Sequence, residues 1–204
     1  MTPAFRADIQ IIRGGAIIFV FLYHLLPSRV PAGFLGVDIF FVLSGFLMCA
    51  IYDPSSHEKI RDFFFSRARR ILPAYFTVLL FVVAVAAVVV LPHEFNEVVR
   101  HAIYSTFLIP NIGYWIDGSY FDKSAFRPAL HFWSLGLEFE FYLIVPIVVW
   151  LHARRSGLLA AFALASFVAC IAVVAVRPRY AFYLLPFRLW EFLLGFYAFK
   201  LTQL

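Results

Sequence analysis

An arginine and a histidine in the first apolar stretch have the spacing that most directly suggests chemistry. Arg13 and His24 lie in residues 9–26 with ten residues between them. On an α-helix this spacing puts both side chains within about 20° of one face and about 16 Å apart along the axis. Ionisable groups inside a membrane span are costly and indicate a functional site by default. The pair therefore predicts a buried site reached from two sides of a membrane. The alternative is that Arg13 snorkels to a headgroup and His24 is a hydrogen-bonded interior histidine.

The second apolar stretch supplies a carboxylate that can act with this histidine. Asp38 lies near the start of that stretch, and a short loop connects this start to the His24 end of the first stretch. A carboxylate beside an imidazole fixes its tautomer and raises its basicity, as a general base requires. The alternative for Asp38 is capping of a helix N-terminus. Gly36 and the Ser44–Gly45 pair of the same stretch would let helices approach closely, and this packing role is as consistent with the sequence as a chemical role.

Three arginines precede the third apolar stretch. Arg67, Arg69 and Arg70 fall within four residues, and guanidinium groups bind phosphate oxygens in a bidentate manner. A cytosolic, nucleotide-bearing cofactor would fit such a group. The alternative is a basic juxtamembrane segment that sets topology and contacts anionic lipid.

Two further apolar stretches contain ionisable groups. Glu138 and Glu140 are two positions apart, so they diverge by roughly 200° on a helix and cannot face one partner. Glu138 is the better candidate for the interior, and His131 shares its face seven positions earlier. Arg188 and Glu191, three positions apart, are expected to neutralise each other.

The composition identifies the class of protein that must position these groups. Of the 204 residues, 63% are hydrophobic and 14% are charged, whereas soluble domains contain about 45–50% apolar residues. This balance predicts an integral membrane protein that spans a lipid bilayer. No basic run stands apart from the apolar segments, so the net charge of +5 does not indicate nucleic-acid binding. Both cysteines lie in apolar stretches, so neither a disulfide nor a metal site is expected.

Six apolar segments approach the roughly 20 residues that a spanning helix needs. They are residues 9–26, 34–52, 71–91, 132–151, 157–176 and 180–199. We predict an all-α, polytopic membrane protein with about six transmembrane helices, forming a single domain over residues 1–204. With a cytoplasmic N-terminus, the inner segments carry nine lysines and arginines and the outer segments six, which favours that orientation. Arg13 interrupts the first apolar run, so we expect this run to remain as an anchor.

The longest segment between spans, residues 91–131, is then extracytoplasmic. Residues 102–116 are apolar enough to lie in the membrane interface, but Pro110, Asn111 and Gly113 argue against a full span. Four ionisable residues of this segment are expected to be solvated surface groups: His93, His101, Asp117 and Asp122.

Taken together, these residues resemble the membrane acyltransferase family 3, the integral membrane O-acyltransferases that modify bacterial surface and exported polysaccharides. The resemblance covers nearly the whole chain. The matching positions are Arg13 and His24; Gly36, Asp38, Phe40, Phe41, Ser44 and Gly45; Arg67, Arg69, Arg70, Ile71, Pro73 and Tyr75; His131, Trp133, Ser134, Leu135, Glu138, Phe141, Tyr142 and Pro146; and Arg188, Glu191 and Gly195. Gln10 stands where many relatives have Asp, and Glu140 where Gln is common. Members usually continue into further spans, so we expect the chain to correspond to the N-terminal part of the usual family domain.

The resemblance implies transfer of an acyl group, often acetyl, from cytosolic acyl-CoA to a sugar hydroxyl on the far side of a bacterial cytoplasmic membrane. It implies a catalytic group formed by His24, Asp38 and Glu138. It implies an acyl-CoA-binding group formed by Arg13, Arg67, Arg69 and Arg70. It implies acceptor contacts from His131, Trp133 and Ser134. It also implies that His24 acts as a general base or carries the acyl group covalently.

Two other functions remain open at this point. In a transporter, the intramembrane charges would line a substrate path without chemistry. In a non-catalytic relative, the chain would pack against another membrane protein.

Overall fold

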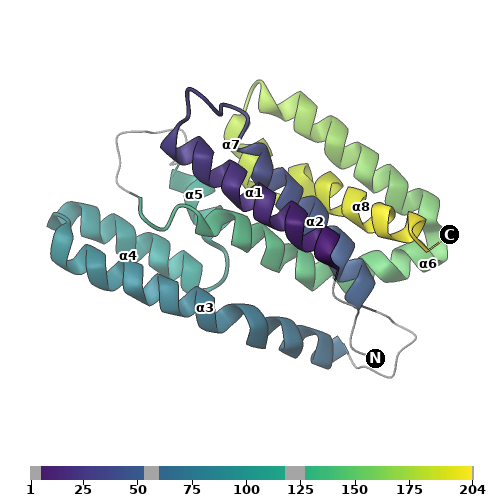
Figure 1. Ribbon diagram of the computed structural model, residues 1–204, viewed down its shortest axis with the longest axis horizontal. Helices are drawn as coiled ribbons and strands as arrows, with labels where there is room; N and C mark the ends of the chain where they lie inside the picture. The colour runs from purple at the N-terminus through teal and green to yellow at the C-terminus, as the bar shows by residue number, and fades with distance from the viewer. Residues whose placement is uncertain (1–5, 53–59, 118–126, 204) are drawn as a thin grey trace. The chain divides into compact units, whose positions relative to one another are not determined.

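The computed structural model describes residues 6–52, 60–117 and 127–203, and in these ranges the regular secondary structure is entirely helical (Figure 1). The helices are α1 (Ala7–Leu25), α2 (Leu35–Ile51), α3 (Ile60–Val89), α4 (Pro92–Thr106), α5 (Pro110–Asp117), α6 (Phe132–Val174), α7 (Pro178–Tyr183) and α8 (Leu185–Leu201). Three of them, α1, α3 and α6, are long and apolar enough to cross a membrane, and α2 is a shorter apolar helix. The prediction of an all-α, polytopic membrane protein is confirmed.

Helix α6 contains two of the predicted segments. Its backbone leaves the helical conformation at Arg155, with φ −150° and ψ 67°, which lies in the predicted gap between residues 151 and 157. The chain reverses direction at this break, and the two arms of α6 run antiparallel (Figure 1). The six predicted segments therefore correspond to α1, α2, α3, the two arms of α6, and α8 with the end of α7.

Two helix boundaries differ from the prediction. Helix α3 begins at Ile60, well before the predicted start at residue 71, so the arginine cluster lies on the helix itself. The predicted segment 180–199 is divided at Leu184, whose backbone is extended with φ −105° and ψ 131°. Pro186 explains this break, because proline has no N–H to donate and its ring clashes with the preceding helical turn.

The chain forms two compact units, one of residues 1–51 with 191–204 and the other of residues 52–190. The first unit contains α1, α2 and the C-terminal part of α8. Gly36 of α2 lies against Ala16 of α1, where an added Cβ would come within 2.6 Å of the Ala16 carbonyl oxygen. Gly45 of α2 lies against the backbone of Phe192 in α8. The packing role expected for these two glycines is confirmed.

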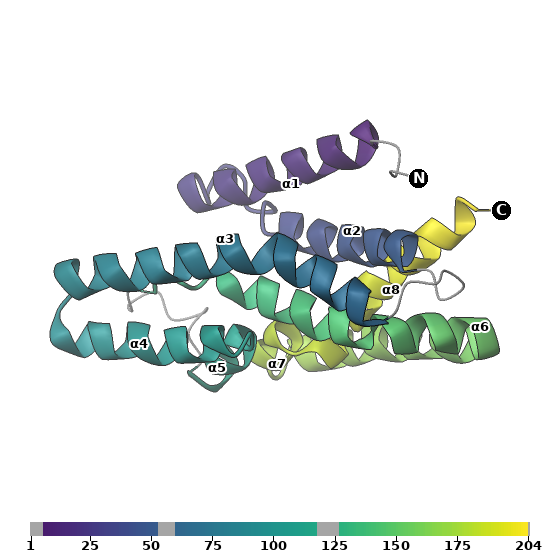
Figure 2. The ribbon, with the colours of Figure 1, turned by 90° about the horizontal axis from the view of Figure 1, so that it is seen from below.

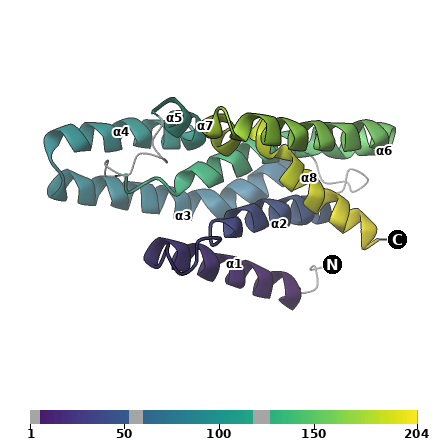
Figure 3. The same cartoon turned by 90° about the horizontal axis from the view of Figure 1, so that it is seen from above.

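The second unit contains α3 to α7 and the start of α8. Helices α3 and α4 lie side by side and antiparallel (Figures 2 and 3). The buried Tyr75 of α3 donates its hydroxyl hydrogen to the Ser105 carbonyl of α4 at 2.9 Å. Tyr75 also packs with Leu79, Ala129 and Phe132 in a buried cluster, which connects the α3–α4 pair to the start of α6. The prediction of a single domain over residues 1–204 stays a prediction.

Candidate functional site

The imidazole of His24 is held by its own helix. Its Nδ1 lies 2.8 Å from the carbonyl oxygen of Val20, one turn earlier in α1. A carbonyl oxygen can only accept, so Nδ1 carries the hydrogen and Nε2 keeps the lone pair of the neutral ring. The ring also packs edge-to-face on Tyr23, with centroids 5.3 Å apart. His24 thus presents Nε2 as its basic nitrogen.

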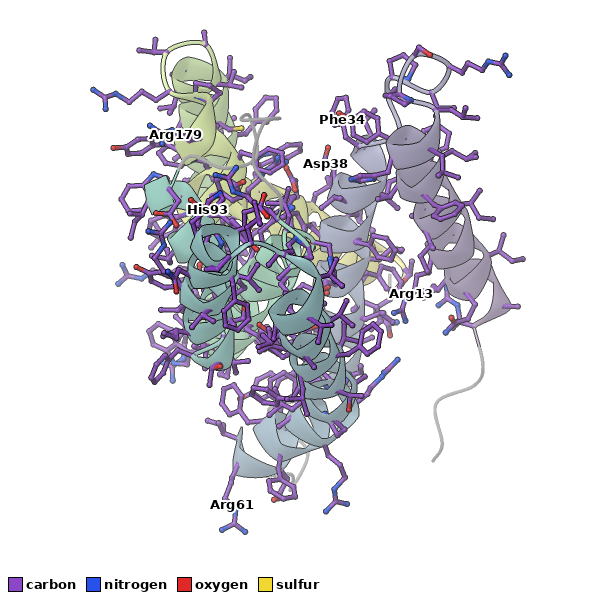
Figure 4. The ribbon with its side chains drawn as sticks, turned by 90° about the vertical axis from the view of Figure 1, so that its left-hand side faces the viewer. Arg13, Phe34, Asp38, Arg61, His93 and Arg179 are labelled. Atoms are coloured by element: carbon purple, nitrogen blue, oxygen red, sulfur yellow. The ribbon has the colours of Figure 1, made fainter. Side chains whose placement is uncertain are left out.

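Arg13 and Asp38 lie in the same unit as His24. Arg13 is half-buried and sits near the start of α1, while Asp38 is half-buried on α2 near the end that connects to α1 (Figure 4). His24 is at that same connecting end, as the short loop predicts. Gly33 allows this close approach, because a Cβ there would lie 2.6 Å from Cβ of Tyr23. The Val20 carbonyl fixes the His24 tautomer, and the joint action of Asp38 with His24 stays a prediction.

The arginine cluster occupies the first turns of α3 in the second unit. Arg67 is half-buried and its Nε has no hydrogen-bond partner, whereas Arg69 and Arg70 are exposed. The guanidinium of Arg69 lies over the ring of Phe65, 5.1 Å from its centroid. Arg67 and Arg70 are three positions apart and share a helix face. These two arginines are therefore placed to act together. Arg69 is two positions after Arg67, so its side chain diverges from that of Arg67 by roughly 200° around the helix.

The start of α6 holds the residues predicted to contact an acceptor. His131 is exposed at the N-cap position, and Ser134 donates its hydroxyl hydrogen to the His131 carbonyl at 3.3 Å. Trp133 is buried, with its ring 4.3 Å from the ring of Phe182 in α7. Glu138 is half-buried one turn further along. Trp133 is thus placed to support this turn, and His131 is the most accessible of the group.

Helix α8 contains the predicted Arg188–Glu191 pair in its first two turns. The guanidinium of Arg188 lies 5.3 Å from the centroid of the Phe182 ring, and Glu191 is 1% exposed. Neutralisation of one by the other stays a prediction.

A buried polar cluster on α4 and α5 corrects the sequence interpretation of two residues. His101 and Asp117 were expected at the solvated surface, but His101 is 2% exposed and its Nε2 lies 2.8 Å from Oδ2 of Asp117. Arg100 pairs with the same carboxylate oxygen at 3.2 Å. The His101 ring stacks on Tyr114 with centroids 4.2 Å apart. The prediction was wrong because the antiparallel return of α5 onto α4 pairs residues sixteen positions apart. Asp122 lies outside the described residues.

Burial of His101 predicts a pH-dependent stability for the α4–α5 pair. Burial lowers the pKa of this imidazole, and the nearby positive charges of Arg100 and Arg127 lower this pKa further. The Asp117 carboxylate acts in the opposite direction and raises it. A lowered folded-state pKa means that the unfolded chain binds more protons, so stability is full above about pH 6.5 and falls as the pH decreases below it. Amide hydrogen exchange in α4 and α5, corrected for its intrinsic pH dependence, should be faster at about pH 5.5 than at about pH 7.5.

The matched control for this pH effect is His101→Phe, which keeps an aromatic ring against Tyr114 and removes the titrating group. In that variant the corrected exchange rates should no longer differ between the two pH values. An equal pH dependence in the variant would contradict the role of His101.

The described helices define a polytopic membrane protein whose first span presents a histidine suited to proton transfer. The chain matches the family described as an acyltransferase domain (Acyl_transf_3) over residues 6–203, and it therefore belongs to this family. The family resemblance inferred from the sequence motifs is confirmed.

Staphylococcus aureus contains several proteins similar to this chain. A protein of strain COL, provisionally named an O-acetyltransferase, is 35% identical over 143 residues, which cover 68% of this chain and 24% of that protein. The O-acetyltransferase OatA of strain NCTC 8325 / PS 47 is 32% identical over 153 residues, covering 72% of this chain and 25% of OatA. The chain thus spans about a quarter of the length of the curated relatives it matches. No solved structure matches the chain significantly.

Proposed function

We propose that this protein transfers an acyl group, most simply acetyl, from cytosolic acyl-CoA to a sugar hydroxyl of a cell-surface or exported polysaccharide or glycolipid. Membership of the acyltransferase domain family and similarity to proteins named O-acetyltransferases support acyl transfer. The observation that carries the proposal is the His24 geometry. A histidine within the first span, with Nδ1–H held by the Val20 carbonyl, leaves Nε2 available to accept a proton.

The donor is proposed to enter from the cytosol. Arg67 and Arg70 share a face of α3 and would bind the phosphates of acyl-CoA, because bidentate guanidinium contacts suit phosphate oxygens. Arg69 lies on another face of α3, over the ring of Phe65. Arg13 would then guide the acyl-bearing arm toward His24. The rise of about 16 Å between Arg13 and His24 along α1 is comparable to an extended pantetheine arm. This scheme requires the cytoplasmic membrane of a bacterium with the N-terminus in the cytoplasm.

The transfer step conserves atoms and protons within the site. Nε2 of His24 accepts the hydroxyl proton of the sugar while the sugar oxygen attacks the thioester carbonyl carbon. The new ester C–O bond forms, the C–S bond breaks, and the leaving thiolate of CoA takes the proton back from His24. Asp38 would stabilise the transient imidazolium, with Glu138 as the third catalytic group. A route through a covalent acyl-histidine is the second form of the same chemistry.

The acceptor is proposed to bind beside the start of α6. The exposed His131 would contact the sugar directly, and the buried Trp133 would hold this turn against α7. Ser134 donates to the His131 carbonyl, so it would stabilise an oxyanion only after that hydrogen bond is released.

Label transfer in proteoliposomes tests this function. With radiolabelled acetyl-CoA and a panel of soluble oligosaccharides, we expect release of CoA thiol and appearance of label on sugar. Replacing Arg67 and Arg70 together with alanine should weaken acetyl-CoA binding at least tenfold, because each lost charge-assisted hydrogen bond contributes about 1.5–3 kcal/mol. Arg61→Ala is the matched control, since Arg61 lies at the start of α3 with an 87% exposed side chain (Figure 4).

The outcomes separate the three functions. Sugar labelling that disappears in the double variant and persists in Arg61→Ala supports acyltransferase activity. Sugar movement across the bilayer without consumption of acetyl-CoA would instead support a transporter. The absence of both sugar labelling and acetyl-CoA binding would contradict the proposed function and would favour a non-catalytic role.

A further inference from the structure

Asn111 connects three helices of the second unit through one amide group. It is the second residue of α5 and is 0% exposed. Its Nδ2 donates to Oε1 of Glu140 in α6 at 2.8 Å and to the backbone carbonyl of Tyr183, at the end of α7, at 3.1 Å. The two hydrogens of one NH₂ group therefore hold α5, α6 and α7 together. The side-chain NH₂ group of asparagine is uncharged and carries two hydrogens, so it can donate to both acceptors at once.

The amide is seated directly on the backbone of α6. Gly136 lies one turn before Glu140, and a Cβ at Gly136 would clash with Oδ1 of Asn111 and come within 3.0 Å of Cδ of Pro110. Because residues four positions apart share a helix face, Gly136 and Glu140 form a single face of α6 that α5 covers. Trp133 lies near the same face and packs on Phe182 of α7. This face of α6 is therefore fixed at three successive turns.

The opposite face of α6 carries the groups proposed for chemistry. His131 and Glu138 are seven positions apart and lie within about 20° of each other. Glu138 diverges from Glu140 by roughly 200°, so the His131–Glu138 face points away from α5. Fixing the rotation of α6 on the Gly136–Glu140 face thus sets the direction in which His131 and Glu138 point.

We infer that Asn111 is a positioning residue of the acyl-transfer site. Its amide fixes the rotation of the first turns of α6 and thereby sets the direction in which His131 and Glu138 point. This inference rests on the proposed function. Asparagine is required because Glu140 and the Tyr183 carbonyl are both acceptors, and an aspartate at position 111 would place a third acceptor among them with no hydrogen to donate.

An exchange of donor and acceptor tests the inference. Asn111→Asp should lower kcat for acetyl transfer by about 100-fold, the effect expected from a misplacement of about 1 Å. The KM for acetyl-CoA should change little, because the proposed donor-binding arginines lie on α1 and α3. Glu140→Gln alone should keep near-normal kcat, since the glutamine carbonyl still accepts from Asn111. The combined variant should recover part of the lost kcat, because the amide of Gln at position 140 can then donate to Asp at position 111, while the Tyr183 carbonyl still lacks the donor that Asn111 supplies. Size-exclusion profiles in detergent establish that each variant is folded.

Each outcome decides one question. Wild-type kcat in Asn111→Asp, or no recovery in a folded double variant, overturns the positioning role. A rise in KM for acetyl-CoA as large as the loss of kcat also overturns it, because the substitution would then act on donor binding as well as on the transfer step. If the unsubstituted chain does not transfer acetyl, the proposed function itself is overturned. This failure is distinguishable from failure of the positioning role, because it is seen without any change at residue 111.

Discussion

Replacing His24 with alanine is expected to abolish acetyl transfer while leaving membrane insertion and acetyl-CoA binding intact. The substitution removes Nε2, the basic nitrogen that the Nδ1–H bond to the Val20 carbonyl leaves available. Loss of a positioned general base slows a reaction by about 10²–10⁴-fold. The side chain is exposed within the described residues, so its removal leaves no cavity in the core. The measurement is the initial rate of acetyl transfer from radiolabelled acetyl-CoA, with acetyl-CoA binding determined in parallel.

His93 supplies the matched control for this experiment. It is an exposed histidine at the start of α4 (Figure 4), and no step of the proposed chemistry uses it. His93→Ala should transfer acetyl at the normal rate. If His24→Ala retains the normal rate as well, or if both variants lose it equally, His24 is not the base and the scheme fails.

Hydrophobic length made most of the fold predictable. Spanning helices are specified by long apolar runs, so the positions of α1, α2 and α3 follow from local sequence, and the break of α6 follows from Arg154 and Arg155 between two such runs. The division between α7 and α8 also has a local signal in Pro186, which the apolar run obscured. The early start of α3 was missed because a charged helical extension does not differ in composition from a polar connection.

The candidate site was predictable only in the placement of residues within one helix. The sequence predicted that Asp38 fixes the His24 tautomer, whereas in the structure the imidazole bonds to the Val20 carbonyl one turn earlier in α1. Helical periodicity did place Arg13 and His24 on the same helix. The contact of His101 with Asp117 depends instead on the turn that returns α5 along α4, where Leu108 has a positive φ of 62°. The Asn111–Glu140 hydrogen bond requires the packing of three separate helices. Neither composition nor spacing specifies such contacts, because they depend on tertiary packing.

Replacing Gly45 or Gly195 with alanine is expected to cause the largest loss of stability of any single methyl addition to the first unit. A Cβ at Gly45 would clash with the Phe192 carbonyl oxygen and lie 2.7 Å from its carbon. A Cβ at Gly195 would clash with the Val42 carbonyl oxygen in the same way. Both clashes involve backbone atoms, which no side-chain rotation relieves, so α2 and α8 must separate. Their stacked Phe41 and Phe192 rings, 4.8 Å apart, would separate as well.

The loss of stability in Gly45→Ala is measured relative to the same substitution at Gly15, a glycine with open space around it. Overpacking typically destabilises by about 1–3 kcal/mol, and we expect the upper end at Gly45, measurable as a melting temperature in detergent lowered by on the order of 10 °C. Gly15 lies in the interior of α1, and beyond its chain neighbours and the adjacent backbone of its own helix no atom lies within 4 Å of an added Cβ. Gly15→Ala should therefore be neutral or stabilise by about 0.5–1 kcal/mol, because alanine loses less backbone entropy in a helix. Equal melting temperatures for Gly45→Ala and Gly15→Ala would mean that α2 and α8 do not make this close crossing in the membrane.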